Sequence, residues 1–147
     1  MPEIDNIKKL SKKLRKNILF MAKAGGSHAA HIGGALSIVD VLSTLFSNYF
    51  VIKKNSEDRD RFILSKGHAC LVLYAILYEK QFINESDLET FEQSGSDLLG
   101  HPVKNKKIGI DFSTGSLGMG LSLATGVAIS LKKKNIRRNV YVVLGDG

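Results

Sequence analysis

The sequence contains one cysteine, no tryptophan and only two prolines among its 147 residues. Because Cys70 has no partner, no disulfide can form within the chain, which fits a reducing compartment. No apolar run approaches the roughly 18 residues of a membrane-spanning helix. The first 16 residues are mostly polar and lysine-rich, unlike a secretory signal, and Glu3 and Asp5 disfavour a mitochondrial transit peptide. We therefore expect a cytoplasmic protein that does not enter a membrane.

Acidic residues are fewer than basic ones, 14 against 21, which gives a net charge of +7. The basic residues concentrate in two runs, over 8–16 and 132–138. The first forms the polar side of a predicted helix, and the second follows a predicted helix, where cations suit the helix dipole. No aromatic residues interleave with these runs to stack on bases. We therefore expect no nucleic-acid partner, whereas an anionic substrate such as a sugar phosphate suits the charge.

Helical periodicity dominates the first third of the chain. Apolar residues recur every three or four positions over 5–23, which predicts an amphipathic helix that ends at Gly25 and Gly26. The strongly apolar segment 36–50 predicts a second helix, capped by Ser37 or by the glycines before it. Cys70 lies among apolar residues and is predicted to be a packing residue rather than a nucleophile.

The rest of the chain alternates between predicted strands and helices. Short apolar runs at 61–65 and 139–144 predict two strands. Helices are predicted from Gly67 to Tyr78, over 85–93 with Asn84 or Ser86 near its cap, and over 117–133, where small residues let another backbone approach closely. Segment 94–112 reads as irregular. This order indicates an α/β fold with a parallel sheet flanked by helices, and two strands alone indicate an incomplete domain.

Three segments carry the histidines of the chain. Loop 27–34 holds His28 and His31 beside small residues, and imidazole can pass protons near neutral pH. His68 follows a strand and opens a helix, a geometry suited to an anion. His101 lies between Gly100 and Pro102, and the proline could fix it in place. Each segment alone is also open to a structural interpretation, as a surface loop, a helix start or an exposed turn, and that interpretation is the favoured one for loop 27–34 and for His101.

Two glycine-rich segments complete the pattern. Segment 113–120 opens a helix and resembles a general anion site, although neither a P-loop nor a dinucleotide fingerprint is present. Asp146, between Gly145 and Gly147, follows the second predicted strand. A carboxylate between glycines suits Mg²⁺ bound together with a diphosphate. Close helix packing and a β-turn are the respective alternatives.

Taken in order, these five segments resemble the N-terminal, diphosphate-binding region of transketolases. The resemblance covers nearly the whole chain, and the domain it implies is a partial transketolase N-terminal diphosphate-binding domain over 1–147. Its motifs are His-Ile-Gly-Gly at 31–34, Asp-Arg-Phe-Ile-Leu-Ser-Lys-Gly-His-Ala at 60–69, Gly-His-Pro at 100–102, Thr-Gly-Ser-Leu-Gly-Met-Gly at 114–120 and Gly-Asp-Gly at 145–147.

The resemblance implies a fold, a reaction and roles for the histidines. The fold would be an incomplete thiamine-diphosphate-binding α/β fold. The enzyme would transfer a two-carbon ketol unit between sugar phosphates of the pentose phosphate pathway. His31 and His101 would face the substrate and donate hydrogen bonds or relay protons, and His68 would lie beside the cofactor. The cofactor would perform the carbon–carbon chemistry, while the protein positions it.

Cofactor and metal contacts are also implied by the resemblance. Gly115, Ser116 and Leu117 would contact thiamine diphosphate through backbone and apolar groups. Asp146 would bind Mg²⁺, and Gly147 would touch the diphosphate. The family's second metal ligand and its pyrimidine-binding domain lie beyond the residues that match. We therefore expect that the partner is a C-terminal transketolase portion or subunit, that the assembly is dimeric, and that this chain alone does not turn over.

The sequence departs from the family in three places. Ile32 replaces proline, as in separately encoded N-terminal transketolase subunits, Met119 replaces a frequent glutamine, and His28 is additional. Another thiamine-diphosphate enzyme, related to deoxyxylulose-phosphate synthase, is an alternative that two motifs disfavour, Gly100-His101-Pro102 and His31-Ile32-Gly33-Gly34. A second alternative is an inactive fragment that only binds a related transketolase chain, because the strand at 139–144 would leave an exposed sheet edge.

Overall fold

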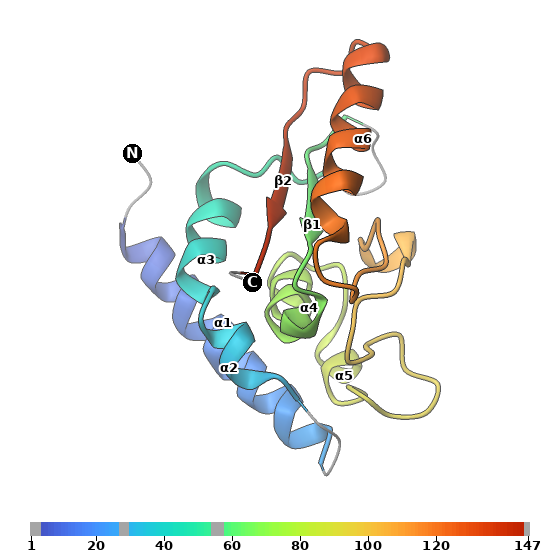
Figure 1. Cartoon of the computed structure of the whole chain (residues 1–147). Helices are drawn as coiled ribbons and strands as arrows, with labels where there is room; N and C mark the ends of the chain where they lie inside the picture. The colour runs from blue at the N-terminus through green and yellow to red at the C-terminus, as the bar shows by residue number, and fades with distance from the viewer. Residues whose placement is uncertain (1–3, 27–29, 54–57, 146–147) are drawn as a thin grey trace.

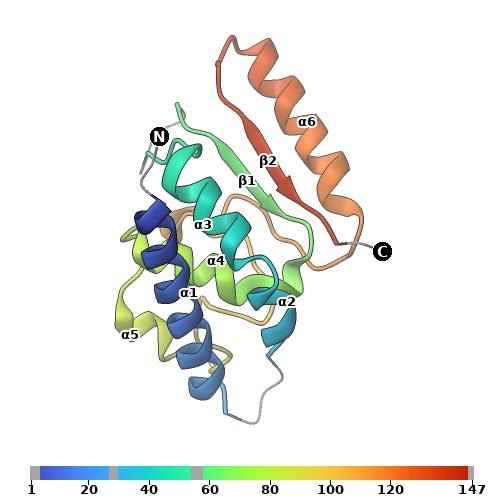
Figure 2. The same cartoon turned by 90° about the vertical axis from the view of Figure 1, so that its left-hand side faces the viewer.

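The computed structural model describes residues 4–26, 30–53 and 58–145. Helix α6 (Met119–Lys133) lies along one flank of a two-stranded sheet, and helices α1 (Ile4–Ala24), α3 (Val39–Asn48) and α4 (Cys70–Glu79) lie on the other (Figures 1 and 2). Within the described residues, no helix combines the length and apolar character needed to cross a bilayer. The elements in chain order are α1 (Ile4–Ala24), α2 (Ile32–Leu36), α3 (Val39–Asn48), β1 (Arg61–Leu64), the 3₁₀ turn η1 (Gly67–Ala69), α4 (Cys70–Glu79), α5 (Glu85–Leu88), the 3₁₀ turn η2 (Lys106–Ile108), α6 (Met119–Lys133) and β2 (Val140–Val143).

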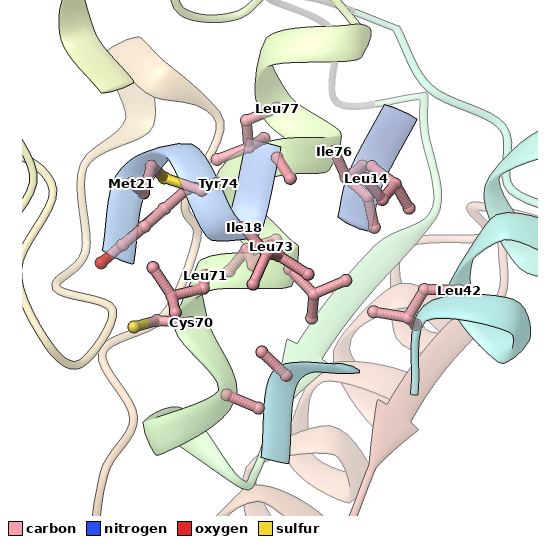
Figure 3. Packing of buried hydrophobic residues seen from close by; sticks show 14 of the residues in the cluster. Leu14, Ile18, Met21, Leu42, Cys70, Leu71, Leu73, Tyr74, Ile76 and Leu77 are labelled. Atoms are coloured by element: carbon pink, nitrogen blue, oxygen red, sulfur yellow. The ribbon is translucent and has the colours of Figure 1, made fainter. Parts of the chain in front are cut away.

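The core is built around α4. This helix is apolar on every side and is buried from Cys70 to Leu77, as expected for a helix at the centre of a fold. The amphipathic helix α1 covers it with Leu14, Ile18 and Met21, which are fully buried. Figure 3 shows these side chains meeting the residues of α4. The prediction that Cys70 is a packing residue is confirmed by its burial.

The two strands pair in parallel, which confirms the predicted parallel sheet flanked by helices. Arg61 lies opposite Val140, and Leu64 lies opposite Val143. Phe62 packs edge-on against Phe46 of α3, with ring centroids 5.2 Å apart. The helix α6 packs against β2 and β1. All four residues of β2 are only partly buried, so the described part of the fold leaves this strand incompletely covered.

The predicted helix over 36–50 is wrong in its start and its continuity. Helix α2 already begins at Ile32, and α3 begins again at Val39. Ser37 does not cap α3, because its hydroxyl donates to the carbonyl of Gly34 at 2.9 Å. Such a local side-chain bond competes with the helix ladder. The helical ladder is interrupted at Ile38, whose N–H donates to the carbonyl of Ala35 at 3.4 Å, three residues back. Hydrophobic periodicity does not reveal this interruption.

The predicted helix over 85–93 is too long. Helix α5 ends at Leu88, and its start is a capping box between Asn84 and Asp87, which confirms Asn84 as the cap. Glu92 adopts a left-handed backbone conformation with φ of 58°, which no helix can contain. The other predicted elements are confirmed, with ends that differ by at most three residues, and segment 94–112 is irregular apart from η2.

Ser65 joins three elements at the carboxyl end of β1. Its backbone N–H donates to the carbonyl of Val143 in β2 at 2.8 Å. Its hydroxyl accepts from the N–H of Gly120 at the start of α6 at 3.1 Å. A Cβ on Gly120 would overlap the side chain of Ser65 and lie 2.9 Å from its Cα. Close approach of α6 to the sheet therefore requires glycine at 120, as the small residues of this helix predicted.

Replacing Gly120 with alanine is expected to destabilise the fold by about 1–3 kcal/mol, because the new methyl group overpacks this junction. Gly126→Ala is the matched control, since a Cβ there meets nothing within 4 Å. The control should stabilise α6 by roughly 0.5–1 kcal/mol through helix propensity. Urea unfolding of the two variants measures both effects. Equal stabilities for the two variants would contradict the role assigned to Gly120.

Candidate functional site

Three histidines from distant parts of the sequence meet at the site. His31 precedes α2, His68 lies in η1, and His101 lies in the irregular segment before η2. The ring of His31 lies 5.4 Å from that of His68 and 6.2 Å from that of His101, both edge-on. His31 and His101 are exposed, and His68 is partly buried. The arrangement therefore presents imidazole groups of three segments to one accessible region.

The glycine-rich segment 113–118 lies directly against the start of η1. A Cβ on Gly67 would come within 2.8 Å of the carbonyl carbon of Thr114 and 2.9 Å of the amide nitrogen of Gly115. Only glycine at 67 allows this backbone-to-backbone contact without a shift. The segment that carries His68 and the glycine-rich segment are therefore held side by side.

His101 is in contact with the same glycine-rich segment. A Cβ on Gly115 would lie 3.3 Å from Cδ2 of His101. The backbone of Pro102 is fixed as well, because its carbonyl accepts from the N–H of Thr114 at 3.0 Å. Pro102 is buried while His101 is exposed. The chain is thus anchored directly after His101, whose ring remains free to reach a ligand.

A groove of about 530 Å³ runs beside the start of α6. This volume is in the range of small-molecule sites. The hydroxyl of Thr114 is buried and has no hydrogen-bond partner within the described residues. An orphaned buried hydroxyl calls for a water or ligand atom. The groove is lined by Ser113, Thr114, Gly115, Ser116, Met119, Gly120, Ser122 and Leu123.

His68 has a pKa below its ordinary value of 6.5. Partial burial is the largest cause, followed by the positive field of His31, Lys66 and His101. The imidazole of His68 is therefore neutral at pH 7, so one ring nitrogen donates and the other accepts a hydrogen bond. A neutral ring suits hydrogen bonding to a ligand better than charge pairing.

The predicted site residues are only partly brought together. His31, His68, His101, Gly115 and Ser116 lie in or beside the histidine cluster and the groove. Leu117 is 62 % exposed and is not among the residues that line the groove.

Asp146, Gly147 and His28 lie outside the described residues. Over the ranges that are described, no group of three or more His, Cys, Asp or Glu side chains is arranged for a metal ion. The hydrogen bond between Ser65 and Val143 brings the carboxyl end of β2 beside the segment that leads to His68. Because Asp146 lies outside the described residues, the magnesium site predicted there stays a prediction.

Sequence reasoning gave no role to three residues that shape the site, although two of them, Ser65 and Thr114, lie within the motifs at 60–69 and 114–120. Ser65 binds both β2 and α6, and Thr114 contributes the orphaned hydroxyl. Tyr74 donates to the carbonyl of Leu99 at 2.7 Å, two residues before His101. The signal for Tyr74 was available, because it carries a hydroxyl in the otherwise apolar run 71–77. A buried hydroxyl requires a hydrogen-bond partner.

Comparison with known proteins gives a consistent result. Residues 8–147 match the family described as "Transketolase, thiamine diphosphate binding domain". The chain is 39 % identical, over 149 residues, to an apulose-4-phosphate transketolase subunit of Actinobacillus succinogenes, covering 97 % of this chain and 52 % of that protein. It is 36 % identical, over 132 residues, to a 6-deoxy-6-sulfo-D-fructose transketolase subunit of a Clostridium species. This match covers 88 % of this chain and 48 % of that protein.

Solved structures agree with these sequence matches. The transketolase of Campylobacter jejuni superposes with a TM-score of 0.88 at 29 % identity, over 99 % of this chain and 24 % of that one. The Leishmania mexicana transketolase gives a TM-score of 0.85 at 28 % identity, over 96 % and 23 %. The chain spans about half the length of the curated subunits that it matches.

The lowered pKa of His68 predicts a pH dependence of stability. In this case the unfolded chain binds the proton more tightly than the folded one, so the free energy of unfolding rises with pH between the folded pKa and about 6.5. Stability should therefore fall as pH drops below about 6.5, and the fall should stop below the folded pKa of His68. Urea unfolding of the wild type and of His68→Gln measures this, and an unchanged pH profile in the variant would contradict it.

Proposed function

The chain belongs to the transketolase family through its thiamine diphosphate binding domain, and from that premise we propose that it forms the N-terminal part of an enzyme that transfers a two-carbon ketol unit between sugar phosphates. The observation that carries the proposal is the meeting of His31, His68 and His101 beside segment 113–118. These residues come from four of the five segments on which the family resemblance rests.

Thiamine diphosphate fits the groups that the groove offers. The orphaned hydroxyl of Thr114, the side chain of Ser116 and the backbone of Gly115 supply polar groups at the amino end of a 15-residue helix. Polar donors at a helix amino end suit a diphosphate. When bound, the cofactor supplies the carbon nucleophile of the reaction. Leu117 does not line the groove, so its side chain would reach the cofactor only from the edge of the groove.

His31 and His101 would act on the substrate. Both rings are exposed and face one region, so each can reach a hydroxyl or carbonyl oxygen of a bound sugar. An imidazole nitrogen can accept a proton from a substrate hydroxyl and return it to a developing alkoxide. The neutral ring of His68 would lie beside the cofactor and form hydrogen bonds with it. Asp146 would bind Mg²⁺, with Gly147 against the diphosphate.

The substrate proposal is a class rather than one sugar. Two of the subunits similar to this chain are named for apulose 4-phosphate and for 6-deoxy-6-sulfo-D-fructose. Both names describe a keto sugar that carries an anionic group at one end. Lys66 lies close to His68 and contributes to its lowered pKa, so positive charge is present at the site. We therefore propose an anionic ketose as donor and an aldose as acceptor.

A C-terminal transketolase portion or subunit is the proposed partner. Its docking surface would be α6 and the end of β2, because large apolar side chains are exposed there. Soluble proteins rarely expose such groups together without a partner. The exposed side chains are Leu117, Met119, Leu121, Ile129 and Leu144, each at least 43 % accessible. The completed enzyme is proposed to be dimeric.

Activity should require assembly. With the complementary C-terminal polypeptide, thiamine diphosphate and Mg²⁺, the enzyme is expected to transfer ketol units from a panel of anionic ketoses, whereas this chain alone should show no turnover above background. His31→Ala and His101→Ala should each lower kcat/KM by roughly 10²-fold, the lower end of acid–base contributions. A coupled aldose-acceptor assay measures all of these rates.

Val41→Ala is the control for this assay, because the side chain of Val41 is 60 % exposed on α3. It should keep wild-type activity. Transfer by the chain alone would contradict the need for a partner. A completed enzyme that is inactive on every ketose, but active in a parallel deoxyxylulose-phosphate synthase assay, would replace the proposed reaction with the alternative one.

The docking surface is tested by charge insertion. Leu121→Arg is expected to weaken association with the C-terminal polypeptide by about tenfold or more, because an unpaired charge would be buried in the interface. Val41→Arg is the matched control, since α3 lies on the other flank of the sheet (Figure 2) and Val41 is at least as exposed as Leu121. Titration calorimetry measures both affinities. Equal affinities would place the interface elsewhere.

A further inference from the structure

The backbone before His101 is fastened to α4 by two buried side chains. The hydroxyl of Tyr74 donates to the carbonyl of Leu99 at 2.7 Å. The thiol of Cys70 donates to the carbonyl of Gly100 at 3.1 Å. Cys70 and Tyr74 lie four positions apart and hence on the same face of the helix. Figure 3 shows the sulfur and the hydroxyl oxygen pointing to the same side of α4.

We propose that Tyr74 and Cys70 are positioning residues that fix the location of His101 in the site. Neither residue touches the histidine. Each holds one of the two carbonyl groups that directly precede it. The inference rests on the proposed function in one respect, namely that His101 faces the substrate.

Segment 98–102, which carries His101, is held by further contacts. The N–H of Glu92 donates to the carbonyl of Leu98 at 2.9 Å. A Cβ on Gly100 would overlap the carboxylate of Glu92, so the chain passes this side chain closely. Together with the bond between Thr114 and Pro102, these contacts fix the backbone on both sides of His101. The exposed imidazole is thus carried by a fully anchored segment that has no regular secondary structure.

Both donors keep their protons under physiological conditions. Burial, and after it the charge of Glu92, raises the pKa of the Cys70 thiol to about 12. Burial also raises the pKa of the Tyr74 hydroxyl well above its usual range. Tyr74 is rigid, since it is fully buried and its ring packs 6.3 Å from that of Phe91. A rigid donor on the central helix suits the precision that catalytic groups require, because small displacements lower rates steeply.

The test is a double-mutant cycle in the completed enzyme. Tyr74→Phe removes one hydroxyl and should lower kcat about tenfold while KM changes less than about twofold, as expected when a reacting group is misplaced. In the His101→Ala background the same substitution should change kcat by less than about twofold, because the residue that Tyr74 positions is gone. Cys70→Ala should lower kcat by a smaller factor, and Cys70→Ser, which keeps a donor, should restore it.

Tyr78→Phe is the matched control, one turn further along α4. Its hydroxyl makes no hydrogen bond with segment 98–102 in the part of the chain that the structure describes. It should leave kcat unchanged. Equal losses from Tyr74→Phe with and without His101, or the same loss from Tyr78→Phe, would reduce Tyr74 to a structural residue and overturn the proposal.

A spectroscopic readout separates this proposal from the proposed function. Labelled histidine in this chain, assigned with His101→Gln, should give an imidazole signal of His101 that shifts and broadens in Tyr74→Phe but not in Tyr78→Phe. An unchanged signal would overturn the positioning role even in an active enzyme. An inactive wild-type enzyme whose His101 signal still responds to Tyr74→Phe would refute the proposed reaction and leave the positioning role supported.

Discussion

The junction at Ser65 is the constraint on which the rest of the site depends. The hydroxyl of Ser65 accepts a hydrogen bond from the N–H of Gly120 in α6, and the N–H of Ser65 donates to the carbonyl of Val143 in β2. Two residues later, Gly67 lets the backbone of Thr114 and Gly115 pass against η1. These contacts bring the carboxyl ends of both strands and the amino end of α6 to one place. In open α/β folds, ligands bind at that edge of the sheet, and here the three histidines gather beside it.

Much of this arrangement could be predicted from the sequence. The periodicity over 5–23 predicted α1, and the β-branched run at 139–144 predicted β2, because burial imposes those patterns directly. Glycines at 67 and 120 were found by their position in motifs, and both proved to be points of close backbone contact. The break between α2 and α3 could not be predicted, since the apolar pattern runs through it while the backbone departs from the helix at Ile38.

The distances between histidines were also beyond the reach of the sequence. His31, His68 and His101 are separated by more than thirty residues at each step. The packing of α2 against η1, and the contact of His101 with Gly115, place the ring of His31 5.4 Å from that of His68 and 6.2 Å from that of His101. Family resemblance suggested roles for these residues but not the contacts that hold them. Tyr74 and Cys70 belong to that second group, because their bonds run to backbone carbonyls of an irregular segment.

We propose that the three histidines and segment 113–118 form one site for cofactor and substrate. A crystal structure of the completed enzyme with thiamine diphosphate, Mg²⁺ and an anionic ketose tests it most directly. We expect the diphosphate to lie against segment 113–118, with Asp146 on the metal and the sugar between His31 and His101. A cofactor bound away from this edge of the sheet, or a sugar that contacts neither histidine, would contradict it.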